Sequence, residues 1–260
     1  MMEGNGQAVS LRWMGWWVLM GALLLPARGA AQSSGGAVWE EQRTLEDAVQ
    51  VESLGQALQV AGTPAPSAAQ KKRPLATVTS PTNQQSFQVS LLTESEALAL
   101  FLELRKDPSI PFGFVFEGAH ARAHAAVRQL ENMGIIAGKA WVEGDLHTTS
   151  REFGGDIRHE FNVAPMILVG SQQVNHPWVL DPAFAERPVP FDDWKTLVAG
   201  GGKSKVTSTY FTPRFHYGPR EKHLSKSAYA AGDIQDAQEI NEIYIERLQI
   251  AREIKKTKQP

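Results

Sequence analysis

The sequence predicts an α+β fold, in which a central helix packs on an antiparallel sheet. Thr93 and Glu96 form a capping box at the start of a helical segment that ends before Pro108. An alanine-rich stretch at residues 119–130 is typical of a second helix. Apolar runs separated by turn residues are typical of strands, and they occupy residues 139–144, 161–169 and 178–182. We expect a further short strand at residues 112–116.

The C-terminal part of the chain predicts one long amphipathic helix over residues 233–256. Its apolar residues recur at helical spacing and form one stripe, made of Ile234, Ala237, Ile240, Tyr244, Leu248 and Ala251. This stripe must pack against the rest of the domain or against a partner. Residues 186–229 are turn-rich and mixed in character, and no element is predicted there.

Four segments are predicted along the chain. Residues 1–31 form a signal peptide, residues 32–85 a linker or pro-segment, residues 86–230 the globular domain, and residues 231–260 the C-terminal helix. The middle segment is rich in Pro, Gly and Ser, which do not build a packed element.

The signal peptide is predicted from its three parts. Arg12 supplies the positive charge, residues 13–25 form the apolar stretch, and Gly29 and Ala31 are the small residues before the cleavage point. This stretch is too short for a bilayer span, which needs roughly 20 residues. We therefore expect a secreted or periplasmic protein with no stable membrane insertion after cleavage. The alternative interpretation is an uncleaved membrane anchor.

Composition excludes several kinds of chemistry. A formal net charge of −2 gives no electrostatic reason to expect nucleic acid as a partner. The chain has no cysteine, which excludes disulfides, thiolate metal sites and a cysteine nucleophile. His120 and His124 are four residues apart on a predicted helix, but no Glu follows His120 as zinc proteases require. We predict neither a metal nor a cofactor.

Several short motifs occur in a recognisable order. Residues 117–124 read Glu-Gly-Ala-His-Ala-Arg-Ala-His, residues 162–164 read Asn-Val-Ala, and residues 180–182 read Leu-Asp-Pro, followed by Trp194. From about residue 111 to residue 194 the chain resembles the secreted bacterial protein-glutaminases. In that family the motifs read Asp-Gly-Cys-x-Ala-Arg-Ala-His, His-Val-Ala and Ile-Asp-Pro. The resemblance implies a papain-like or transglutaminase-like core.

The resemblance also assigns roles to residues. It places Ala119 where the family has its nucleophilic cysteine, Asn162 where it has the histidine base, and Asp181 at the retained aspartate. The remaining matched residues have structural roles, and they are Glu117, Gly118, Arg122 and His124. The buried arginine would pair with Glu117 or Asp145, or with backbone carbonyls.

Two substitutions in one triad imply a pseudoenzyme that binds a polypeptide or a glutamine-containing segment. A first alternative is an active protein-glutamine deamidase that releases ammonia, either because Ala119 is an engineered replacement or because His159 or His120 rebuilds the site. His159 precedes Asn162 by three positions, so on a regular strand it points to the opposite face. A second alternative is an interaction module that acts through the C-terminal helix.

Overall fold

The computed structural model describes residues 73–200 and 202–257. The predicted signal peptide and most of the predicted linker lie outside the described residues. The elements follow in the order β1 (Leu75–Thr79), β2 (Ser86–Leu92), α2 (Glu94–Lys106), α3 (Ala119–Asn132), β3 (Gly138–Thr149), β4 (Asp156–Gly170), β5 (Asn175–Val179), β6 (Val189–Pro190), α4 (Phe191–Val198), β7 (Lys205–Pro213), the 3₁₀ turn η1 (Pro219–Glu221) and α5 (Ala231–Thr257). Within these ranges, no helix is both long and apolar enough to cross a membrane.

The described strands form one sheet with the long strand β4 at its centre. The order along the sheet is β1-β2-β4-β3-β7, while β5 pairs with β4 and β6 pairs with β5. All pairs are antiparallel except β2 with β4, which is parallel. The predicted α+β class is therefore confirmed, with one parallel pair that the sequence did not indicate.

A bulge in β3 lies opposite the part of β4 that carries Asn162. Trp141 pairs with Val163, and the regular register continues to the pair of Glu143 with Phe161. The next pair joins Leu146 to His159, so two residues of β3 lie opposite one residue of β4. Residues on both sides of the bulge face α4, because Thr148 donates to the carbonyl of Leu197 and Phe211, the partner of Ala140, contacts Phe191. Asn162 and His159 therefore lie on the same face of the sheet, and the alternation along β4 shifts between them.

The helices pack on the sheet through their apolar faces. In α2 the capping box is present, because the Thr93 side chain accepts from the Glu96 amide and the Glu96 carboxylate accepts from the Thr93 amide. Helix α3 packs against β4 and α5, and α4 packs against β3. The main core lies between these elements and includes Phe101, Leu130 and Trp194, all fully buried.

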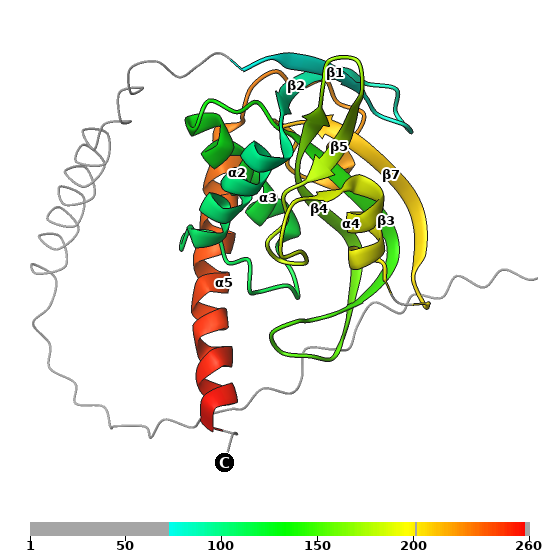
Figure 1. Cartoon of the computed structure of the whole chain (residues 1–260). Coiled ribbons are helices and arrows are strands. Elements are labelled where there is room, and N and C mark those ends of the chain that lie inside the picture. The colour runs from blue at the N-terminus through cyan, green and yellow to red at the C-terminus, as the bar shows by residue number, and fades with distance from the viewer. Residues whose placement is uncertain (1–72, 201, 258–260) are drawn as a thin grey trace, which may run out of the picture. The chain divides into compact units, whose positions relative to one another are not determined.

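The C-terminal helix α5 runs alongside α3 (Figure 1). Its buried face carries Ala237, Asn241 and Leu248, which are in the predicted stripe or next to it. Towards its end, Arg252 donates two hydrogen bonds to Glu152, at 2.5 and 2.9 Å. The predicted stripe therefore packs against the chain's own domain, while the isoleucines on the other side stay exposed, namely Ile243, Ile250 and Ile254.

Three expectations about element boundaries are wrong. Strand β1, at Leu75–Thr79, lies inside the predicted linker of residues 32–85, because its alternating residues pair with β2. Residues 112–116 form turns and no strand; the apolar run is explained by Phe112 and Val115, which pack into the main core. The segment read as turn-rich, residues 186–229, contains both α4 and β7.

Candidate functional site

The site begins at the turn that starts α3. Gly118 has φ +74, a left-handed conformation that glycine adopts without steric cost. A Cβ at this position would lie 2.2 Å from the Tyr244 ring of α5. Ala119 follows as the first helical residue and is 9% exposed. The tight turn thus brings the helix N-terminus against α5 and places the Ala119 methyl group at the start of α3.

A cavity of about 370 Å³ opens over Ala119. The turn and the first turn of α3 line it with Glu117, Gly118, Ala119 and Arg122, so four of the predicted site residues meet there. Strand β4 contributes His159 and Phe161, and Tyr244 closes the side formed by α5. No serine, threonine, cysteine or lysine is among the residues that line this cavity.

The two strand positions of the predicted triad do not line the cavity. Asn162 is 1% exposed, its Oδ1 accepts from the backbone N–H of Val163, and its Nδ2 has no partner. Alternation along β4 places Phe161 and Val163 on the face opposite to Asn162. Those two residues belong with Ala119 to one small apolar cluster, completed by Ala123, Trp141 and Tyr210. The face of β4 towards Ala119 therefore carries Phe161 and Val163.

His159 is held as a neutral imidazole. Burial lowers its pKa to about 4, and the positive charge of Arg122 acts in the same direction. Its Nε2 is buried without a hydrogen-bond partner, and the edge of its ring meets Phe184 at a centroid distance of 6.3 Å. His120 also lines the cavity, and burial lowers its pKa as well. Both side chains are uncharged at neutral pH.

Asp181 follows β5 and is held by two donors. Its Oδ2 accepts from the indole N–H of Trp194 at 2.7 Å, and its Oδ1 accepts from the backbone N–H of Ala183 at 3.1 Å. Burial raises the pKa of this carboxyl group, while the bond from Trp194 and the charge of Arg122 oppose that rise. The Asn162 amide does not donate to it, because Nδ2 has no partner. Asp181 therefore anchors α4 to the end of β5.

Arg122 is bonded to the backbone of the turn before α3. Its Nη1 donates to the carbonyl oxygens of Phe114 at 2.6 Å and Glu117 at 2.5 Å. Burial lowers its pKa to about 10, so the guanidinium stays charged at neutral pH. Of the alternatives that the sequence left open, the backbone carbonyls are correct. Asp145 pairs with Arg158 instead.

His124 takes part in a second buried polar group. Its Nδ1 lies 3.0 Å from Nζ of Lys139, which also donates to the carbonyl of His216. Lys139 is fully buried, and desolvation lowers its pKa to about 7. Desolvation and Lys139 together lower the pKa of His124 to about 2. This group ties α3 and β3 to the segment that precedes α5.

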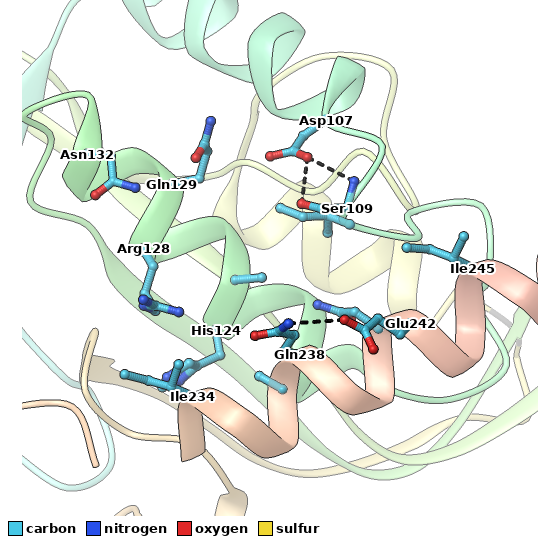
Figure 2. A pocket seen from close by; sticks show the side chains of 14 residues that line it. Asp107, Ser109, His124, Arg128, Gln129, Asn132, Ile234, Gln238, Glu242 and Ile245 are labelled. Atoms are coloured by element: carbon cyan, nitrogen blue, oxygen red, sulfur yellow. Dashed lines mark hydrogen bonds between the residues drawn. The ribbon is translucent and has the colours of Figure 1, made fainter. Parts of the chain in front are cut away.

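A second cavity, of about 320 Å³, lies between α3, α5 and the loop after α2 (Figure 2). Figure 2 shows Arg128 and Gln129 of α3 on one side, and Gln238 and Glu242 of α5 on the other. Of the predicted site residues, only His124 lines it. Throughout the described part of the chain, no three His, Cys, Asp or Glu side chains are placed to hold a metal ion.

Comparison with known proteins agrees with the motif order. Residues 97–198 match a family model described as glutaminase. The resemblance to the protein-glutaminases is confirmed. The matched stretch contains α3, β3, β4, β5 and α4, and with them every residue assigned to the triad and its surroundings.

Solved protein-glutaminase structures are similar to this chain at 20% sequence identity. The NMR structure of protein-glutaminase from Chryseobacterium proteolyticum has a TM-score of 0.48, with 56% of this chain and 85% of that chain covered. A crystal structure of protein-glutaminase has a TM-score of 0.48, with 58% and 88% covered. A crystal structure of pro-protein-glutaminase has a TM-score of 0.47, with 62% and 63% covered. No curated protein matches the chain.

Sequence reasoning missed two features of the site. It did not place Tyr244 at the cavity, since the contact joins residues far apart in the chain. It also treated His159 as pointing away from the site, because the motif order put Asn162 there. Alternation on a regular strand predicted opposite faces for these two residues, whereas the bulge between β3 and β4 leaves both on the face towards α4.

Proposed function

We propose that this protein-glutaminase-like domain is a catalytically inactive pseudoenzyme that binds polypeptide segments at the cavity over Ala119. The observation that supports this most is that Ala119 is the first residue of α3 and lines the cavity, at the position where the resemblance places the family's cysteine. A methyl group cannot form a covalent intermediate. Loss of a triad member typically costs about 10⁴- to 10⁶-fold in kcat.

The cavity has the chemistry of a side-chain binding site. Phe116, Phe161 and Tyr244 supply aromatic surface, and His159 supplies an uncharged polar group. Binding sites for organic side chains are mostly apolar, with a few polar groups that fix orientation. A neutral carboxamide such as a glutamine side chain is compatible with this lining, because the two acidic residues, Glu117 and Glu160, are balanced by Arg122 and Arg158.

An active deamidase is the alternative that one observation favours. His159 lines the cavity, so an imidazole is present even though Asn162 is not one. It would have to activate water directly, and its low pKa makes it a weak base. An interaction module acting through α5 is the second alternative, and the exposed isoleucines on that helix favour it.

The domain acts outside the cytoplasm in this proposal, because the predicted signal peptide directs export. N-terminal sequencing of protein recovered from the medium or periplasm tests this. A start at Gln32 supports it, and an intact N-terminus in the membrane fraction contradicts it.

Binding is tested by fluorescence anisotropy with a labelled, unstructured glutamine-rich peptide and the full chain. We expect saturable binding, competed by unlabelled peptide and weakened about tenfold or more in Ala119→Leu, which extends an apolar side chain into the cavity. Arg128→Leu on the exposed side of the same helix is the matched control and should change the affinity less than twofold. No saturable binding, or equal effects of the two variants, would contradict the proposal.

A further inference from the structure

We infer that the outer face of α5 is a docking surface for one amphipathic helix of another protein, with an apolar stripe flanked by Lys or Arg. The surface consists of Ile243, Ile250 and Ile254, which we call the isoleucine stripe. None of the three lines the cavity over Ala119. The inference therefore goes beyond the proposed function, and neither depends on the other.

The spacing of the isoleucines is typical of a helix that packs along another helix. Ile240, Ile243, Ile250 and Ile254 occupy first and fourth positions of successive seven-residue repeats, and Arg247 occupies the remaining one. This alternation of three- and four-residue steps is the pattern of a coiled-coil seam, where the side chains of one helix pack between those of its partner. A helix that only covers its own domain would instead carry polar residues on the face turned away from it.

The isoleucine stripe is open to solvent within the part of the chain that the structure describes. Its three side chains are 47%, 52% and 42% exposed, in chain order. Tyr244 meets the turn at Gly118, so residues 245–257 continue past the start of α3. This stretch is roughly 20 Å long at the rise of an α-helix, and Figure 1 shows it extending beyond α3. A contiguous exposed apolar surface of this kind marks an interaction site.

A row of exposed glutamates follows one edge of the isoleucine stripe. The row consists of Glu239, Glu246 and Glu253, each seven residues from the next. In a coiled coil this position flanks the seam and faces charged side chains of the partner helix. Glu253 is paired with Lys256 of its own helix at 2.8 Å, but both are exposed, and such a pair contributes little. The row therefore favours a partner with Lys or Arg along the facing edge.

The remaining basic side chains of α5 contact its own domain. The Arg247 guanidinium lies 3.9 Å from the Glu117 carboxylate and 5.5 Å from the centre of the Tyr244 ring. Arg252 donates to the carboxylate of Glu152, and Lys255 donates to the backbone carbonyl of the same residue. These contacts leave the glutamate row as the main charge along the isoleucine stripe.

Two occupants from the chain itself match this charge less well. In an antiparallel pair with a second copy, the two glutamate rows would face each other. In a parallel pair, each row would face the side of α5 that carries Tyr244, which is bonded to Glu117. Residues 40–60 contain five acidic residues and one basic residue. Because like charges oppose all three arrangements, a basic helix of another protein is the occupant that fits.

A single cysteine on the isoleucine stripe tests the inference, because the full chain has no cysteine of its own. Ile250→Cys is labelled with a thiol-reactive dye, with and without a designed helical peptide that carries Leu at the seam positions and Lys at the flanking ones. We expect rapid labelling of the free chain and labelling about tenfold slower or more with saturating peptide. Gln249→Cys, exposed on the neighbouring face of α5, is the matched control and should slow by less than about twofold.

Binding of the same peptide to the native full chain, measured by fluorescence anisotropy, tests the charge. We expect saturable binding that weakens about tenfold or more in Glu246→Lys, and by less than about twofold in Glu103→Lys, which makes the same charge change on α2. A peptide with Glu in place of Lys should bind at least about tenfold more weakly. Circular dichroism confirms that each variant is folded.

Four results would overturn the inference. The first two are no saturable binding of the basic peptide and equal binding of the basic and acidic peptides. Slow labelling of free Ile250→Cys at every protein concentration would assign the isoleucine stripe to a segment of the chain itself. Labelling that slows as the protein concentration rises would assign it to a second copy.

Discussion

Gly118→Ala should be one of the most destabilising single substitutions in the domain. At φ +74 an alanine costs about 1 kcal/mol or more in backbone strain. Its Cβ would also lie 2.2 and 2.6 Å from two carbons of the Tyr244 ring, so the ring must move. That ring stacks on Phe114 at a centroid distance of 4.6 Å and donates to Glu117. Losing these contacts adds about 2 kcal/mol, for a total of about 3 kcal/mol.

A double-mutant cycle in urea separates the two contributions. Tyr244→Ala removes the ring, so in that background Gly118→Ala should cost only the backbone strain of about 1 kcal/mol. The coupling between the two substitutions is therefore expected to be about 2 kcal/mol. Equal costs in both backgrounds would show that α5 does not pack on the turn, and would refute the description of the cavity wall.

Three further substitutions test other parts of the structure. Burial lowers the pKa of Lys139 to about 7, so between about pH 7 and 10 the unfolded chain binds a proton that the folded chain does not. The free energy of unfolding of the native chain, minus that of Lys139→Met, should therefore rise by about 1.4 kcal/mol for each pH unit between pH 7 and pH 10. Urea unfolding of both proteins across this range measures the difference. Trp194→Phe removes a donor from the buried Asp181 carboxylate and should cost about 1–3 kcal/mol in the same assay, whereas Trp178→Phe, for which no such bond is present, should cost less. Thr93→Ala breaks the capping box and should lower the melting temperature through a loss of about 1 kcal/mol, and an unchanged temperature would contradict the cap.

Local sequence signals predicted the helices well. The capping box at Thr93 marks the start of α2, and the turn at Gly118 marks the start of α3, because both depend on interactions within a few residues. The periodic stripe predicted α5 to within two residues at its start and one at its end. In contrast, α4 has only eight residues, and its fold depends on the burial of Trp194 against the sheet.

Strand pairing accounts for most of what the sequence did not reveal. β1 follows a charged and proline-rich stretch, and it is a strand because β2 offers an edge for it. β7 is rich in Ser and Thr and follows a run of glycines, which hid its pairing with β3. The same limit applies to the site. The motif order identified position 162 as the family's histidine position, but the face towards Ala119 follows from packing between distant segments, and it carries Phe161 and Val163.

The central claim is that the native chain does not catalyse deamidation. Its most direct test is ammonia release from casein by the purified full chain, followed to long times at several protein concentrations. The absence of any nucleophilic atom on Ala119 predicts a rate equal to that of casein alone. Ammonia release that is sustained over many turnovers and proportional to the concentration of the chain would contradict the claim.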